Sequence, residues 1–201
     1  SGVKEGDTVV VAGQQRLQKD GTEVRVADVR DGKLHNVRVL AGNTNTSCLS
    51  PEWGPKNQLY FISDASGWWN LWQVDLQGKL THLVDEASEW GFPLWQLGMR
   101  ALSVLPDGHL LSVHGAVDAR KIVRVDPQTR TMQDLNSALT DFKPSLSVSG
   151  SKAYAVGASG KVVSQLIEID LLSWQVCDVV TSIESPVDAS YFPQPHEISA
   201  V

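Results

Sequence analysis

The stretch WGPKNQLYFIS (residues 53–63) recurs 51 residues later as VLPDGHLLSVH (residues 104–114), with Pro55 aligned on Pro106. A related stretch, VSGSKAYAVG from Val148, follows the same course with one residue fewer. Each copy passes from a turn into a short apolar run of the kind that forms a strand. Recurrence at a fixed period predicts tandem copies of one supersecondary unit.

A second feature of the sequence repeats with nearly the same period. An aspartate ends the third strand-like run of each unit, and successive copies are spaced 47, 51 and 44 residues apart: Asp28, Asp75, Asp126 and Asp170. A carboxylate that leaves a strand can accept hydrogen bonds from the backbone amides of the next turn. We therefore interpret these aspartates as turn formers rather than catalytic groups, in four units of about 45 residues.

Strand-like patterns dominate the chain, because short alternating runs rich in Val, Leu, Ile and aromatic residues recur between Gly, Asp, Asn and Pro. The predicted strands are 7–12, 23–28, 34–40, 58–63, 70–75, 79–84, 101–105, 109–114, 121–126, 144–148, 152–156, 163–170 and 174–180. A unit of about 45 residues with three or four such strands matches one blade of a β-propeller. The predicted fold class is all-β: a partial β-propeller of about four blades built from four-stranded antiparallel sheets.

The repeats also predict the domain boundaries. Residues 1–185 form the propeller segment, and residues 186–201, rich in Pro and Ser, form an exit strand or linker. The expected blades are 6–41, 48–85, 95–136 and 143–181.

Composition narrows the possible partners. The 201 residues carry a net charge of -6, and the pI near 5.3 argues against a nucleic-acid partner, which favours a basic face. No run of about 18 apolar residues is present and the first residues lack an apolar signal core, so we expect a cytoplasmic protein without a membrane partner. Cys48 and Cys177 are then expected to be reduced, core-type thiols.

Motifs for catalysis or cofactor binding are missing from the sequence. The nearest string to the G-x-S-x-G of α/β-hydrolases is GASGK (157–161), which lacks the second glycine and reads as a turn. The five histidines show no metal-binding spacing, and no phosphate-binding glycine loop occurs. We therefore predict no catalytic residue, metal or cofactor in this chain.

Three of the seven tryptophans lie in the stretch SDASGWWNLWQVD (63–75). Trp72 falls inside a predicted strand and is expected to pack between blades, burying about 150–250 Å². Trp68 and Trp69 precede that strand, where either a wedge between blades or a platform for a ligand is possible. We favour the wedge.

Two longer stretches resemble a known family. SPEWGPKNQLYFISDASGWWNLWQVDL (50–76) and EASEWGFPLWQLGMRALSVLPDGHLL (86–111) resemble the propeller of the prolyl oligopeptidase family of serine peptidases, in its acylaminoacyl-peptidase or dipeptidyl-aminopeptidase-like bacterial branch. Departures from the family pattern are Gly54 for Ser, Lys56-Asn57 for Asp-Gly, and Trp90 for Phe.

The resemblance implies a two-domain parent enzyme. Such enzymes pair an α/β-hydrolase that carries Ser, Asp and His with a propeller of about seven or eight blades. This chain then corresponds to about the last four blades, and the hydrolase domain is an expected partner outside it. The implied function is non-catalytic: the segment gates access to the active site and helps to bind short peptides.

The resemblance also suggests where a peptide would be bound. We expect DEASEWGFPLWQLGMR (85–100) to line the cavity, with a carboxylate meeting a peptide amino terminus and Arg100 meeting a carbonyl or carboxylate. Solvated loop charges are the alternative for the two glutamates. The candidate substrate-binding residues are Trp68, Trp69, Glu86, Glu89, Trp90, Trp95 and Arg100.

Other functions stay open at this point. A stand-alone TolB-like propeller that acts as a protein-interaction or ligand-binding scaffold is the main alternative, and sugar binding through exposed tryptophans is a weaker one. Four blades of a wider ring would also leave the end blades uncovered, so a homodimer through these faces is expected.

Overall fold

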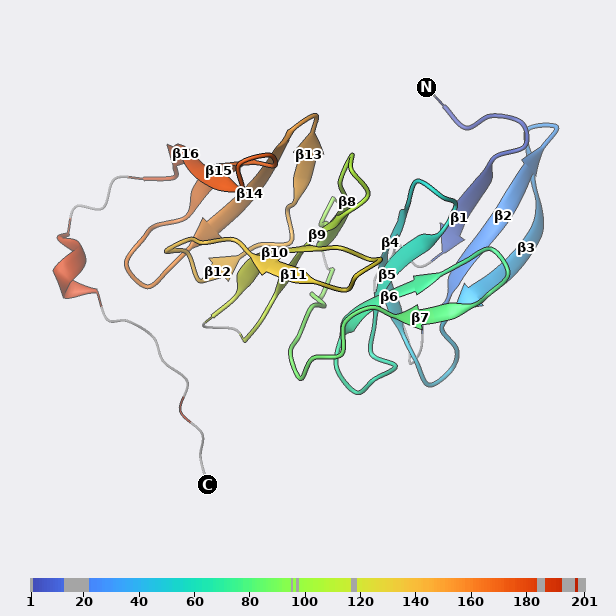
Figure 1. Cartoon of the computed structure of the whole chain (residues 1–201), viewed down its shortest axis with the longest axis horizontal. Coiled ribbons are helices and arrows are strands. Elements are labelled where there is room, and N and C mark those ends of the chain that lie inside the picture. The colour runs from blue at the N-terminus through green and yellow to red at the C-terminus, as the bar shows by residue number, and fades with distance from the viewer. Residues whose placement is uncertain are drawn as a thin grey trace. The chain divides into compact units, whose positions relative to one another are not determined.

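The computed structural model describes residues 2–12, 22–94, 96, 98–116, 119–183, 187–192 and 198. Within these ranges the regular structure consists of β-strands and one short 3₁₀ turn, η1 (Ala189–Tyr191). The chain divides into two compact units, Ser1–Leu97 and Gly98–Val201, and each unit holds two antiparallel sheets (Figure 1). The described part of the chain contains no helix long and apolar enough to cross a membrane.

The first unit contains a three-stranded and a four-stranded sheet. The three-stranded sheet has the order β1 (Thr8–Ala12), β2 (Val24–Arg30) and β3 (Lys33–Ala41). The four-stranded sheet has the order β4 (Cys48–Trp53), β5 (Leu59–Ser63), β6 (Asn70–Val74) and β7 (Leu80–His82). In the latter, each strand pairs with the next along the chain, as in a propeller blade.

The second unit repeats the pattern. Its four-stranded sheet contains β8 (Leu102–Val104), β9 (Leu110–His114), β10 (Lys121–Val125) and β11 (Met132–Asp134). Its five-stranded sheet contains β12 (Asp141–Phe142), β13 (Ser147–Ser149), β14 (Lys152–Ala158), β15 (Gln165–Asp170) and β16 (Gln175–Thr181). The predicted all-β class with about four antiparallel sheets is therefore confirmed, although the first sheet has three strands and the last has five.

Three strands were not predicted from the sequence: β4, β11 and β12. The β4 strand contains Pro51 and has a register shift between Leu49 and Glu52, where Ser50 has a φ of 50°. A proline and a bulge interrupt the alternation that identifies a strand. The other two strands have three and two residues, and most of these are exposed, so no apolar run marks them in the sequence.

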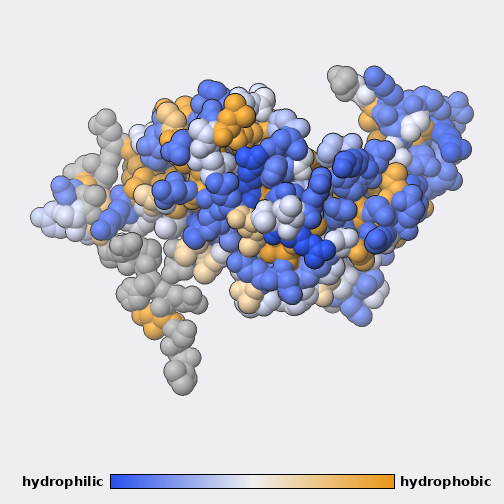
Figure 2. Space-filling model, in the orientation of Figure 1, coloured by the Kyte–Doolittle hydropathy of each residue, from blue (hydrophilic) through white to orange (hydrophobic). Residues whose placement is uncertain are grey.

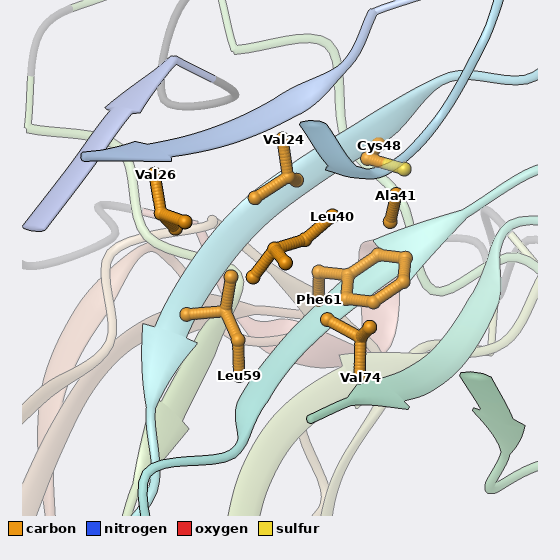
Figure 3. Packing of buried hydrophobic residues seen from close by; sticks show 8 residues of the cluster. All are labelled: Val24, Val26, Leu40, Ala41, Cys48, Leu59, Phe61 and Val74. Atoms are coloured by element: carbon orange, nitrogen blue, oxygen red, sulfur yellow. The ribbon is translucent and has the colours of Figure 1, made fainter. Parts of the chain in front are cut away.

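The core of the first unit lies between its two sheets (Figure 3). Val24, Val26 and Leu40 come from the first sheet and meet Leu59 and Phe61 of the second. Burial of such side chains contributes about 1.5–3 kcal/mol each, so this cluster fixes how the two sheets face each other.

Trp72 packs against the same cluster, which confirms the prediction that this residue lies between blades. Its indole stacks on the ring of His82, its cross-strand neighbour, with ring centroids 4.1 Å apart and an angle of 13° between the planes. This pair extends the packed layer from β6 to β7.

Two side chains connect the sheets of the second unit. Arg124 of β10 donates to the carbonyl oxygen of Leu171 over 3.2 Å, and Trp174 donates from Nε1 to the carbonyl oxygen of Asp134, also over 3.2 Å. Because each bond joins one sheet to the other, these residues fix the two sheets together.

Three of the four repeated aspartates form turns as predicted. Asp75 accepts from the amides of Gln77 and Lys79, at 3.0 and 2.8 Å. Asp126 and Asp170 do the same, with Gln128 and Ser173 as their closest amide donors.

Asp28 is the exception. It accepts from the side chains of Thr8, Asn36 and Arg38 across the sheet. The β2 strand continues two residues past Asp28, so the hairpin turn falls on Asp31-Gly32, both with positive φ, as a two-residue turn between twisted strands requires.

The two cysteines are free thiols, as expected, but only one belongs to the core. Cys48 is buried in the first unit, and this burial raises its pKa to about 12. Cys177 is exposed on β16, so its prediction as a core-type thiol was wrong. An outer strand has one open side, and the sequence pattern alone did not reveal that β16 is outermost.

The predicted exit segment, residues 186–201, falls largely outside the described residues. The structure describes 187–192 and 198 of it, including η1.

Candidate functional site

The tryptophan-rich turn lies beside the segment that follows β7. Residues 64–69 connect β5 to β6, and residues 83–92 leave the end of β7. Because β6 and β7 are antiparallel neighbours, the start of β6 and the end of β7 lie at the same end of the sheet. The backbone amide of Trp90 donates to the carbonyl oxygen of Trp69 over 2.8 Å, which joins the two segments directly.

Asn70 fastens these segments together. Its side chain is 1% exposed, and its amide nitrogen donates to the carbonyl oxygens of Glu86 and Ser88, at 3.0 and 3.1 Å. Its amide oxygen accepts from the backbone of Glu86 and from the Ser66 hydroxyl, both over 3.3 Å. A buried amide bonded on both its donor and acceptor sides holds one loop conformation, since each lost bond would leave a buried polar group unsatisfied.

The two glutamate side chains also hold the loop. Trp90 is fully buried, and its indole nitrogen donates to the carboxylate of Glu86 over 3.0 Å. The carboxylate of Glu89 accepts from the backbone amide of Trp69 over 3.3 Å. The Glu86 carboxylate therefore contacts the segment after β7, and the Glu89 carboxylate contacts the tryptophan turn.

The indole of Trp69 lies over Gly91. A Cβ atom added to Gly91 would come within 2.7 Å of Cγ and 2.8 Å of Cβ of Trp69, so only glycine allows this approach. Trp69 is half-buried as a result, whereas Trp68 is 43% exposed. Among the described tryptophans at this end of the sheet, Trp68 presents the largest surface to a ligand.

The structure thus brings together five of the seven predicted site residues: Trp68, Trp69, Glu86, Glu89 and Trp90. Arg100 belongs to the second unit, where its backbone pairs with the segment before β13: its amide donates to the carbonyl oxygen of Pro144 over 2.7 Å. Trp95 lies outside the described residues. Peptide binding by these residues stays a prediction.

Sequence reasoning missed Asn70 and Gly91, which hold the tryptophans in place. The available signal was a polar residue at the first position of an apolar strand, in the string WWNLW. Such a residue is expected to be buried and bonded, because the strand around it enters the core.

Charged side chains gather at the corresponding end of the β8–β11 sheet, which is the third sheet along the chain, where β9 ends and β10 begins. His114, 7% exposed, lies with Nε2 3.1 Å from a carboxylate oxygen of Asp134, and Lys121 donates to the other oxygen over 2.7 Å. Partial burial raises the pKa of Asp134, but the hydrogen bonds from Lys121 and His114 outweigh it and leave that pKa below its usual range. In the described ranges, no group of three or more His, Cys, Asp or Glu side chains is arranged to hold a metal ion.

No family model matches the chain, and no curated protein matches it either. Solved structures do match. A puromycin-hydrolyzing peptidase from Mycobacterium tuberculosis superposes with a TM-score of 0.86 and 29% identity over 94% of this chain. A puromycin hydrolase superposes with a TM-score of 0.85 and 30% identity over 95% of it. The chain spans 29% of the length of each of these proteins.

More distant structures share the fold alone. One of two prolyl endopeptidases matches 92% of the chain at 17% identity, with a TM-score of 0.65. TolB from Acinetobacter baumannii matches 87% of it at 16% identity, with a TM-score of 0.61. The chain forms four sheets of antiparallel strands, and nearly its whole length superposes on peptidase structures. We therefore identify these sheets as propeller blades. The chain has the fold of a β-propeller segment, consistent with the propeller of prolyl oligopeptidase-family peptidases.

Proposed function

We propose that this chain is the non-catalytic propeller segment of a serine peptidase of the acylaminoacyl-peptidase-like branch, where it limits access to the active site and helps to bind short peptides. The observation that carries the proposal is the 30% identity to a puromycin hydrolase over 95% of this chain. The chain covers only 29% of that enzyme, so the catalytic machinery is assigned to another part of the parent protein.

The physical basis of the gate is a size filter. A rigid ring of blades in front of a nucleophile excludes folded proteins and admits flexible peptides. Rigid loops are needed for this, and the bonds of Asn70 supply rigidity at one end of the second sheet. We assign Glu86 and Glu89 to shaping this loop, since both already accept hydrogen bonds from it. Trp68 is the side chain that we place against a peptide.

The first test is the gene that encodes this chain. We expect the reading frame to include a G-x-S-x-G motif in an α/β-hydrolase domain. The protein it encodes should hydrolyse puromycin or peptide nitroanilides and be inhibited by serine-directed reagents, whereas the 201-residue chain alone should hydrolyse neither substrate. A reading frame without a hydrolase domain, or activity of this chain alone, would contradict the proposal.

The second test addresses peptide binding in the intact protein. Trp68→Ala should raise KM for tripeptide and tetrapeptide substrates several-fold and leave kcat/KM for a small ester nearly unchanged, since loss of a stacking surface costs about 0.5–1.5 kcal/mol. The control is Leu172→Ala, which truncates an 86% exposed side chain in the β15–β16 turn. Equal kinetics for Trp68→Ala and the control would rule out a role for Trp68.

The likeness to TolB supports one alternative, a stand-alone scaffold propeller. A reading frame that contains only propeller blades would favour that alternative over the peptidase.

A further inference from the structure

A cavity of about 330 Å³ opens in the second unit, between the start of β10, the end of β11 and the segment that leads to β12. Leu135, Leu139 and Phe142 form an apolar floor, and each is at most 5% exposed. Arg120 and Asp134 contribute charge to the wall. The volume lies at the lower end of the range of about 300–1,000 Å³ that small-molecule sites span.

The position of this cavity can be compared with the second sheet, because the two blades repeat. In the second sheet Ser63 pairs with Asn70 at the end of β5 and the start of β6. The corresponding pair in the third sheet, 51 residues later, is His114 with Lys121. By the same offset, Arg120 occupies the position of Trp69.

Backbone bonds of both residues are consistent with this equivalence. Trp69 accepts from the amide of Trp90 over 2.8 Å, and Arg120 donates from its own amide to the carbonyl oxygen of Thr140 over 2.9 Å. In both blades the residue before the third strand therefore pairs with the segment that follows the fourth strand.

What differs is the filling of the space between these two segments. In the second sheet, the Trp69 ring lies over Gly91. In the third sheet, Arg120 replaces Trp69, Ala119 replaces Trp68, and the region is open as a cavity. The cavity thus lies beside the position where the neighbouring blade holds the Trp69 ring, and part of its lining is apolar, so an aromatic ring complements it.

The charged side chains around the cavity indicate which polar group the ligand should carry besides the aromatic ring. The carboxylate of Asp134 is engaged by both Lys121 and His114, at 2.7 and 3.1 Å. Arg120 forms a longer ion pair, 3.5 Å, with Asp141, whose side chain is 55% exposed. The Arg120 side chain is 24% exposed, and a long pair to a largely exposed carboxylate contributes little, so a ligand carboxylate can compete with Asp141 for the guanidinium.

We propose that this cavity binds the carboxy-terminal residue of a short peptide that ends in an aromatic side chain, with the ring on the apolar floor and the terminal carboxylate on Arg120. The choice of a peptide as the ligand rests on the proposed function. Bidentate recognition of a carboxylate by Arg is specific for the free carboxy terminus, and an amide cannot replace it.

The experiment measures binding of Ala-Ala-Phe, Ala-Ala-Phe-amide and Ala-Ala-Ala to the 201-residue chain by calorimetry. We expect Ala-Ala-Phe to bind at least roughly tenfold more tightly than the other two, as expected for loss of one charge-assisted contact or one buried ring. Arg120→Met should reduce the affinity for Ala-Ala-Phe to that for the amide. Asp141→Asn should raise the affinity for Ala-Ala-Phe several-fold, because this substitution removes a competing carboxylate.

Two further variants control for other causes. Ala119→Trp places a ring at the mouth of the cavity on an exposed position and should abolish binding of all three peptides. Arg38→Met removes an arginine that is ion-paired with Asp28 in the first unit, and it should leave binding unchanged. Thermal denaturation of each variant verifies that it is folded.

The outcomes separate this inference from the proposed function. Peptide binding that does not change with the amide, with Arg120→Met or with Ala119→Trp would overturn the cavity assignment and leave the peptidase proposal standing. Hydrolysis by the intact protein, without any peptide binding to this chain, would have the same consequence. Binding that follows the predicted pattern, in a protein whose gene encodes no hydrolase, would support the cavity and contradict the peptidase proposal.

Discussion

Single polar residues decide the shape of the tryptophan turn. Asn70 makes its bonds at 1% exposure, so the loop conformation depends on one amide group more than on the aromatic rings around it. Composition draws attention to the tryptophans, but the bonding of Asn70 determines where they lie.

Replacement of Asn70 tests this dependence. Asn70→Asp keeps the shape of the side chain but cannot donate to the carbonyl oxygens of Glu86 and Ser88, so we expect the free energy of unfolding to fall by about 1–3 kcal/mol. Urea denaturation measures the change. Trp68→Ala, on an exposed side chain, should alter the same quantity by no more than about 0.5 kcal/mol. Equal effects of the two substitutions would contradict the role of Asn70.

Gly91 provides a second test at the residue scale. In Gly91→Ala, the new methyl group would lie within 2.8 Å of two atoms of Trp69, so the indole must move away from the segment after β7. We expect a loss of about 1–3 kcal/mol of stability, as for overpacking, and a shift of tryptophan emission to longer wavelength. The control is Ala87→Ser, which also adds one heavy atom, but at an exposed position of the same segment. Unchanged emission in Gly91→Ala would mean that Trp69 does not depend on this contact.

At the scale of elements, the repeated aspartates show how a short motif specifies a hairpin. Asp75, Asp126 and Asp170 each fold the turn after a third strand by accepting from backbone amides. Asp28 shares the period but not the turn, because its strand continues past it. The recurring aspartate therefore predicts where each repeat lies in the sequence better than it predicts which groups its carboxylate contacts.

These turns should make stability depend on pH. The backbone and side-chain hydrogen bonds from Ser173 hold the pKa of Asp170 below its usual range, and those from Gln128 and Thr129 do the same for Asp126. A carboxyl group with a lower pKa in the folded state stabilises the fold above its unfolded pKa, near about 4, and loses this contribution as the pH falls through the folded value.

The free energy of unfolding should accordingly decrease as the pH is lowered from about 5 towards 2. Asp170→Asn should be less stable than the wild type at pH 7 and show a shallower decrease in acid, because one titrating group has been removed. Urea denaturation at a series of pH values measures both effects, with Asp85→Asn, at an exposed position after β7, as the control. Parallel pH profiles for Asp170→Asn and the wild type would argue against this linkage.

Strands were predictable from the sequence where they lie in apolar runs bounded by turn residues. The apolar runs of β5, β6, β9 and β10 gave nearly the observed bounds, since core strands of a repeated blade are buried and rich in Leu, Ile and Val. Detection failed at β4, where Pro51 and the bulge disturb the alternation, and at β11 and β12, whose residues are mostly exposed.

At the scale of the whole molecule, the 51-residue repeat in the sequence predicted the propeller architecture. The candidate site could be predicted only in part. The tryptophans could be predicted as important, because aromatic clusters stand out in a sequence. The cavity beside Arg120 could not, because it arises where Ala119 and Arg120 stand at the positions of two tryptophans in the neighbouring blade. An empty space has no sequence motif, and it becomes visible only when two repeats are compared in three dimensions.

The surface predicts how the isolated chain behaves in solution. Figure 2 shows a largely hydrophilic face with scattered hydrophobic side chains. The outer strand β3 ends the strand order of its sheet and carries Leu34, Val37 and Val39, which are 55%, 57% and 46% exposed. Edge strands with exposed apolar side chains promote pairing between chains unless charges protect them.

We therefore expect the apparent mass of this chain in multi-angle light scattering to rise with concentration, towards that of a dimer. Val37→Lys should lower the tendency to associate, because an edge lysine opposes strand pairing. Val3→Lys is the matched control: it introduces the same charge at a 66% exposed valine that lies outside any strand. If association depends on strand pairing at β3, Val37→Lys will raise the concentration at which the chain associates, and Val3→Lys will not. A strict monomer at all concentrations, without binding of a hydrophobic dye, would instead show that the exposed edge of β3 does not drive self-association.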